Sequence, residues 1–131
     1  MSLIATTTVE SKSGYAQTIT AAGHHLTADE SEAAGGTNTG PAPYALLLAA
    51  LGACTSITLR MYADRKGWIL GDIQLSLRHR KSADGADQID RDIKFGASLS
   101  QEQLTRLGEI AEKTPVTKTI KAGATIQTRL V

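Results

Sequence analysis

The only cysteine of this chain, Cys54, lies inside the apolar run LLLAALGACTS at residues 46–56. A thiol can act as a nucleophile and be oxidised, but it also serves as a small apolar side chain in protein cores. The thiolate is the reactive form, and an ordinary cysteine is only a few per cent ionised at neutral pH. A reactive Cys54 therefore needs a cation or a helix N-terminus brought close to it, and we consider Arg91, Arg60 or a residue of a second subunit for that role.

The other chemically active side chains do not form a second site. Adjacent residues of a strand point to opposite faces, so His24 and His25 are poorly placed to bind one metal ion, and His79 lies far along the chain. The sequence contains no Gly-x-Ser-x-Gly elbow, phosphate-binding loop or dinucleotide-binding fingerprint. We therefore expect no metal and no bound cofactor, and any chemistry depends on sulfur.

Composition narrows the classes of partner. The 14 Lys and Arg residues nearly balance the 13 Asp and Glu residues, and only 4% of residues are aromatic, so nucleic acid is not expected as a partner. The longest apolar stretch, Tyr44–Cys54, is about half of the ~20 residues that cross a bilayer, so we expect no membrane span. A single cysteine cannot form an internal disulfide, which suits a reducing compartment. The composition predicts a single cytoplasmic domain over residues 1–131.

The cysteine is predicted to lie on a long helix over residues 43–66. Pro43 suits the first helical turn, Arg65 and Lys66 are cations placed at the negative end, and Gly67 can end the helix in the left-handed conformation. The first half of this helix is apolar on every side, so other protein must cover it. Burial between two subunits would provide that cover, and we predict a homodimer.

Five strands are predicted around this helix. An N-terminal hairpin has strands at 6–12 and 15–21, a short strand follows near 25–28, and 29–40 forms a surface loop. Ile73, Leu75 and Leu77 alternate with polar residues, and a turn at 82–87 leads to a second strand on which Ile89, Ile93 and Phe95 share a face with Arg91. An arginine among apolar neighbours either reaches solvent at the sheet margin or contacts a buried acid or ligand.

Two further helices and a last strand complete the prediction. Ser100 and Gln103 form a capping box at the start of a helix that ends before Pro115. Thr114 is placed to cap a short helix running from Pro115 to about Lys121. Residues 124–131 alternate as a strand. Because strands and helices occur in separate blocks, the fold class is α+β.

Several of these segments resemble one protein family. The segment GPAPYALLLAALGACTSITLRMYADRKGW at 40–68 is similar to the OsmC/Ohr family of osmotically inducible and organic hydroperoxide resistance proteins, and most similar to the branch also found fused to α/β-hydrolase domains. RHRK at 78–81, the strand at 89–95 and IAEKTPVTKTI at 110–120 continue the resemblance in the same order. It therefore covers almost the whole chain.

The resemblance implies an OsmC-like fold, an intertwined homodimer in which β-sheets clasp two long central helices. It also implies a peroxiredoxin-like enzyme of oxidative stress. In that enzyme Cys54 attacks an organic hydroperoxide and becomes a sulfenic acid, a second cysteine closes a disulfide, and an external dithiol reduces it. The apolar walls would select a small apolar hydroperoxide or another apolar ligand.

Three positions depart from the family pattern. Thr114 stands where the family has its second cysteine, and Tyr44 stands where many active members carry a glutamate that orients an arginine. Together with Arg91 and Arg60, Tyr44 is a candidate activating or substrate-binding residue. The family's activating arginine comes from the N-terminal region, but no arginine precedes Arg60. Two interpretations follow: a one-cysteine organic hydroperoxide reductase that uses an external thiol, or a non-catalytic dimeric stress or small-ligand-binding protein with a degenerate peroxidase site.

Overall fold

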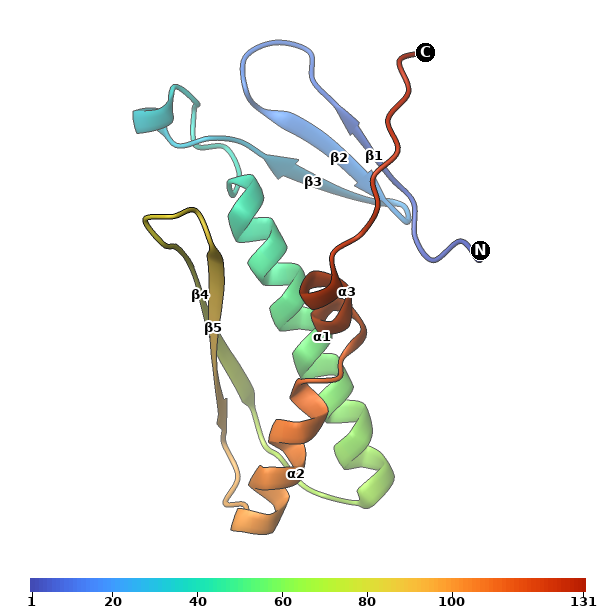
Figure 1. Cartoon of the computed structure of the whole chain (residues 1–131), viewed down its shortest axis with the longest axis vertical. Coiled ribbons are helices and arrows are strands. Elements are labelled where there is room, and N and C mark those ends of the chain that lie inside the picture. The colour runs from blue at the N-terminus through green and yellow to red at the C-terminus, as the bar shows by residue number, and fades with distance from the viewer. The chain divides into compact units, whose positions relative to one another are not determined.

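The computed structural model describes all residues from 1 to 131, and the chain divides into two compact units, residues 1–47 and 48–131. Helix α1 (Pro43–Lys66) begins in the first unit and continues through the second. The single domain predicted over 1–131 stays a prediction. Each unit is described by itself below, with the elements labelled in Figure 1.

The first unit contains the predicted hairpin and third strand. Strands β1 (Thr7–Glu10), β2 (Gln17–Ala21) and β3 (His24–Ala28) form an antiparallel sheet in the order β1-β2-β3 (Figure 1). The turn between β2 and β3 is Ala22-Gly23, with φ of 50° and 81°. Positive φ at both central residues is the geometry that matches the twist of a two-residue hairpin, so this turn sets the register of the two strands.

The loop after β3 is organised by one buried carboxylate, Asp29, which is 2% exposed. Asp29 Oδ2 accepts hydrogen bonds from the hydroxyl and the backbone N–H of both Thr37 and Thr39, and Oδ1 accepts from the Glu30 N–H. These donors stabilise the charged form and hold the pKa of Asp29 well below its usual value. The predicted surface loop is thus a hydrogen-bonded structure that also contains a 3₁₀ turn, η1 (Glu32–Ala34).

Helix α1 has the bounds that the sequence predicted. It begins at Pro43 and ends at Lys66, and Gly67 follows with a φ of 71°. By length and composition alone it could cross a membrane, with a hydropathy of 1.5 in its most apolar window, but Leu59 and Ala63 belong to the hydrophobic core. At Gly52 a Cβ atom would lie 2.9 Å from Cδ1 of Leu77, so the glycine allows a strand to pack closely on the helix.

That strand belongs to the second predicted hairpin. Strands β4 (Ile73–Lys81) and β5 (Asp87–Phe95) are antiparallel, with Leu77 opposite Arg91. Residues of β5 that are two apart point to the same face, and these are Ile89, Arg91, Ile93 and Phe95, as predicted. The arginine therefore lies among the apolar side chains of its strand.

Helices α2 (Gln101–Ala111) and α3 (Pro115–Ala122) complete the second unit. Both halves of the predicted capping box are formed by Ser100 and Gln103, and the Thr114 side chain caps α3 as predicted. The core is built from α1, α2 and the connection after α1, with partly buried side chains of the sheet packed against it. Its buried members are Leu59, Ala63, Leu70, Leu107 and Ala111.

The predicted C-terminal strand is wrong for this chain. Residues 124–131 form no strand, and Ile126 and Leu130 are 85% and 98% exposed. The segment does alternate apolar and polar residues, but a strand is not stable without a neighbouring strand to accept and donate its backbone hydrogen bonds. The observed fold is α+β with five strands, three α-helices and one 3₁₀ turn.

Candidate active site

Cys54 lies in the middle of α1 and is partly buried, with a free thiol. The buried residues of α1 all lie in the second unit. They are Leu51, Gly52, Thr55, Leu59 and Ala63. Each residue turns an α-helix by about 100°, so Cys54 lies on the flank of this buried face rather than at its centre. The sulfur has no hydrogen bond and no ion pair within the chain. Within the single chain Cys54 is thus half-buried, and whether it is a reactive or a space-filling thiol stays a prediction.

Cys54 instead belongs to an apolar stripe along the outer side of α1. We call Ala50, Cys54, Ile57 and Met61 the α1 stripe, because residues at positions i, i+4, i+7 and i+11 follow one side of a helix. Ile57 and Met61 are each 54% exposed, and Ala50 is also exposed. Exposed apolar surface of this kind is a candidate for contact with a partner or a ligand.

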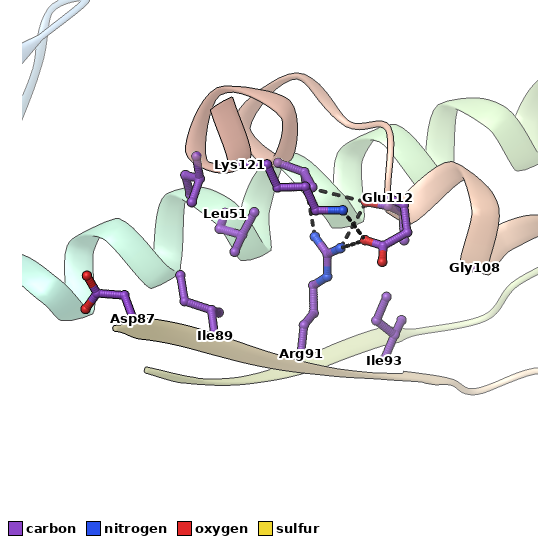
Figure 2. A pocket seen from close by; sticks show the side chains of 11 residues that line it. Leu51, Asp87, Ile89, Arg91, Ile93, Gly108, Glu112 and Lys121 are labelled. Carbon is purple, nitrogen blue, oxygen red and sulfur yellow. Dashed lines mark hydrogen bonds and ion pairs between the residues drawn. The ribbon is translucent and has the colours of Figure 1, made fainter. Parts of the chain in front are cut away.

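Arg91, the first candidate for activating the thiol, is held by four other groups. Its Nη1 donates to the hydroxyls of Thr55 and Thr117, both at 2.9 Å. Its Nη2 donates to the Ala111 carbonyl and to Glu112 Oε2, both at 3.0 Å. Figure 2 shows the Arg91 side chain rising from β5 toward Glu112, flanked by Ile89 and Ile93.

Arg91 thus joins four elements and reaches the neighbour of Cys54 in sequence. Thr55 is fully buried, donates its own hydroxyl to the Leu51 carbonyl at 2.7 Å, and accepts from Arg91. Because Thr55 follows Cys54 by one residue, their side chains leave the helix about 100° apart. The guanidinium therefore fixes the helical turn that carries the cysteine without contacting its sulfur.

Thr114 belongs to the same network. It is fully buried, its Oγ1 lies 2.6 Å from the hydroxyl of Thr117, and it accepts a hydrogen bond from the Thr117 N–H at the start of α3. Since Thr117 in turn accepts from Arg91, the position where the family resemblance puts a second cysteine is connected to the turn of Cys54 through hydroxyl and guanidinium groups.

The two remaining candidates are Arg60 and Tyr44. Arg60 donates from Nη1 to the Gly71 carbonyl at 2.9 Å, which places its guanidinium at the end of the connection after α1. Tyr44 is in the first turn of α1 and is 60% exposed. The activating or substrate-binding role of Arg91, Arg60 or Tyr44 stays a prediction.

Sequence reasoning missed Thr55, Thr117 and Glu112. The first two are buried hydroxyls, and the third receives both Arg91 and Lys121 at its carboxylate. A buried polar residue on an apolar helix face is a usable signal for Thr55, because such a group needs a partner. No local pattern points to Glu112, which lies at the end of α2.

Comparison with known proteins identifies the family. Residues 36–129 match the family model described as OsmC, OsmC-like protein. No curated protein matches the chain.

Solved structures agree with that match. An OsmC-like protein from Mycoplasma pneumoniae is 18% identical with a TM-score of 0.73, covering 92% of this chain and 89% of that one. The organic hydroperoxide resistance protein OhrB of Bacillus subtilis is 23% identical with a TM-score of 0.62 and 91% coverage of both chains. An organic hydroperoxide resistance protein from Legionella pneumophila is 16% identical with a TM-score of 0.66, covering 91% and 90%.

At these identities the likeness shows a shared fold, and in this chain Leu59 and Ala63 of α1 belong to the hydrophobic core. The family model covers more than half of the sequence and includes α1 with its cysteine. The chain therefore belongs to the family of OsmC-like proteins.

Proposed function

We propose that this protein reduces organic hydroperoxides, with Cys54 as the attacking sulfur and an external thiol as the reductant. The observation that carries the proposal is the position of Cys54 in an OsmC-like fold: its thiol lies on the apolar α1 stripe and is not sealed in the core. Two of the structural neighbours are described as organic hydroperoxide resistance proteins. An apolar surface around the sulfur favours an alkyl hydroperoxide over hydrogen peroxide.

The chemistry needs one sulfur and two equivalents of thiol. The Cys54 thiol loses its proton, and the thiolate attacks the terminal oxygen of the hydroperoxide. The O–O bond breaks, and the alkoxide takes up a proton and leaves as the alcohol. Sulfur is thereby oxidised to a sulfenic acid. One external thiol converts the sulfenic acid to a mixed disulfide and releases water, and a second thiol releases the Cys54 thiol and the oxidised disulfide. Because Thr114 stands in place of a second cysteine, this cycle proceeds without an internal disulfide.

The α1 stripe supports a homodimer as the working unit. Ile57 and Met61 are half-exposed apolar side chains on the same side of the helix as Cys54. A second copy that covers this stripe would bury the apolar surface and enclose the cysteine between the two chains. Because Arg91 and Arg60 are held by other groups of the same chain, we propose that the partner subunit supplies the activating cation. A cytoplasmic location fits a thiol that must be kept reduced.

A second function is favoured by one observation. The Cys54 sulfur has no partner within the chain, while Thr114 is fully buried in a hydrogen-bonded network. This arrangement also fits a dimeric stress or ligand-binding protein in which Cys54 only fills space.

Turnover of cumene hydroperoxide with dithiothreitol separates the two functions. We expect the wild-type protein to consume hydroperoxide catalytically and Cys54→Ser to abolish consumption. Ser56→Ala, on the same helix and outside the proposed chemistry, is the matched control and should keep the wild-type rate. Trapping with dimedone should label Cys54 after peroxide treatment. Absence of both turnover and trapped sulfenic acid would leave the second function.

A further inference from the structure

We propose that the cavity between α1, β5, α2 and α3 binds a small organic molecule that has an apolar body and a single negative charge, such as a medium-chain carboxylate. The cavity has a volume of about 620 Å³. Small-molecule sites in proteins are typically about 300–1,000 Å³. Figure 2 shows Leu51 of α1 facing Ile89 of β5 across this space. Glu112 and Lys121 lie beside Arg91, and Asp87 lies apart from them, beyond Ile89.

The walls of the cavity are suited to an aliphatic chain. Ile89 and Ile93 project from one face of β5, and α1 contributes Leu51. Helices α2 and α3 add Ala111 and Ile120. An apolar chain entering here removes both its own surface and that of these side chains from water, which is the main source of affinity in such sites.

The charges at one end of the cavity leave one cation in excess. Glu112 Oε2 receives both Arg91 Nη2 at 3.0 Å and Lys121 Nζ at 3.3 Å, so one carboxylate faces two cations. Asp87 at the rim does not change this balance, because Lys81 Nζ lies 3.1 Å from its Oδ1. His79 also hydrogen-bonds Asp87, and both neighbours lower the pKa of that carboxyl. One further anion would neutralise the group formed by Arg91, Glu112 and Lys121.

Donors remain free for that anion. An arginine has five N–H donors, and the four on the Arg91 Nη atoms are used, which leaves the one on Nε. The Lys121 ammonium has three donors, contacts only Glu112 and is 60% exposed. A carboxylate in the cavity would thus meet donors already oriented by the network. Cys54 is not among the lining residues, so this binding site is independent of the proposed peroxidase chemistry.

The test compares three probes of equal chain length: decanoate, 1-decanol and decylammonium, each titrated calorimetrically at submicellar concentration. We expect decanoate to bind most tightly and decylammonium least. Lys121→Gln should weaken decanoate about tenfold and leave 1-decanol unchanged, because it removes one charge from a partly exposed site. Lys118→Gln, on the same helix and outside the cavity, is the matched control. Glu112→Gln should strengthen decanoate, because it removes the competing carboxylate.

A second variant tests the location. Ile89→Trp should fill the cavity and abolish decanoate binding, whereas Ile69→Trp, at an exposed position outside the cavity, should not. Cys54→Ser should bind decanoate as the wild type does, whether or not it has lost peroxidase activity. Equal affinity for decanoate and decylammonium, no binding at all, or unchanged binding in Ile89→Trp would each overturn the proposal. A change of oligomeric state in Ile89→Trp, with wild-type decanoate binding, would show instead that a second copy occupies this cavity.

Discussion

The Arg91 guanidinium donates from Nη1 to the Thr55 hydroxyl at 2.9 Å, and this contact joins β5 to the turn of α1 that carries Cys54. The two residues are 36 positions apart in the sequence. Thr55 is fully buried, and Arg91 also donates hydrogen bonds to the Thr117 hydroxyl and the Ala111 carbonyl. The guanidinium is therefore the common donor for polar groups from three helices.

Replacing Arg91 with methionine should destabilise the protein by about 3 kcal/mol, because buried hydroxyl and carbonyl groups lose their donor while the aliphatic volume is kept. Urea denaturation measures this change. Arg78→Met is the matched control, since its ion pair with Asp92 is solvent-exposed and should be worth about 1 kcal/mol or less. Equal effects of the two substitutions would show that the buried network does not stabilise the fold.

Introducing a second cysteine at Thr114 tests the redox role of that position. We expect Thr114→Cys, treated with one equivalent of cumene hydroperoxide, to form an intramolecular disulfide with Cys54, as the family resemblance implies for this site. Non-reducing peptide mapping by mass spectrometry detects the product. Thr119→Cys, exposed on the same helix, should form none. If Thr114→Cys forms no disulfide either and its cysteines stay as sulfenic acid or free thiols, a cysteine at this position cannot react with oxidised Cys54.

Asp29 should make the fold sensitive to acid. Its pKa is lowered in the folded protein by the hydrogen bonds from Thr39 and Thr37, so the stabilisation is present above the unfolded pKa of about 4 and is lost as the pH falls below it. Asp29→Asn removes the charge at every pH. It should therefore lower the melting temperature at pH 7 and flatten the loss of stability below about pH 4.

Melting curves between pH 7 and pH 2 check this dependence. Glu32→Gln removes an exposed carboxylate of the same loop and should leave the acid-dependent part unchanged. If the melting temperatures of the wild type and Asp29→Asn fall equally as the pH is lowered, groups other than Asp29 cause the acid sensitivity.

The α1 stripe should be the contact surface of the homodimer. Ile57→Glu places a charge on this stripe, and twofold symmetry would bury it twice, so we expect the dimer dissociation constant to rise about 100-fold or more. Light scattering over a dilution series measures the shift. Ile69→Glu changes an isoleucine that is 81% exposed and lies outside α1, and it should leave assembly intact. A wild type that is monomeric at all concentrations would remove the dimer from the proposal.

Local sequence signals predicted most of the secondary structure. The bounds of α1 followed from Pro43, the terminal cations and Gly67, and the capping box at Ser100 followed from residues three positions apart. The hairpins followed from alternation and turn residues. These signals act within a few residues, so the sequence displays them directly.

The candidate site was predicted only in part. The sequence pointed to Cys54, Arg91 and Thr114 separately, but it did not show that Arg91 contacts Thr55 and Glu112 rather than the sulfur. Residues 124–131 carry the alternation of a strand, yet whether such a segment pairs depends on a neighbour elsewhere in space.

The sequence by itself determined the helices, the hairpins, the α+β class and the one thiol of the chain. Only the tertiary structure decided which groups surround that residue. It placed Cys54 on an uncovered apolar side of α1 and directed the Arg91 guanidinium to buried hydroxyls on another side. The physical reason is that periodicity and capping are set by neighbours along the chain, whereas the partners of a buried charge are set by packing between elements far apart in sequence.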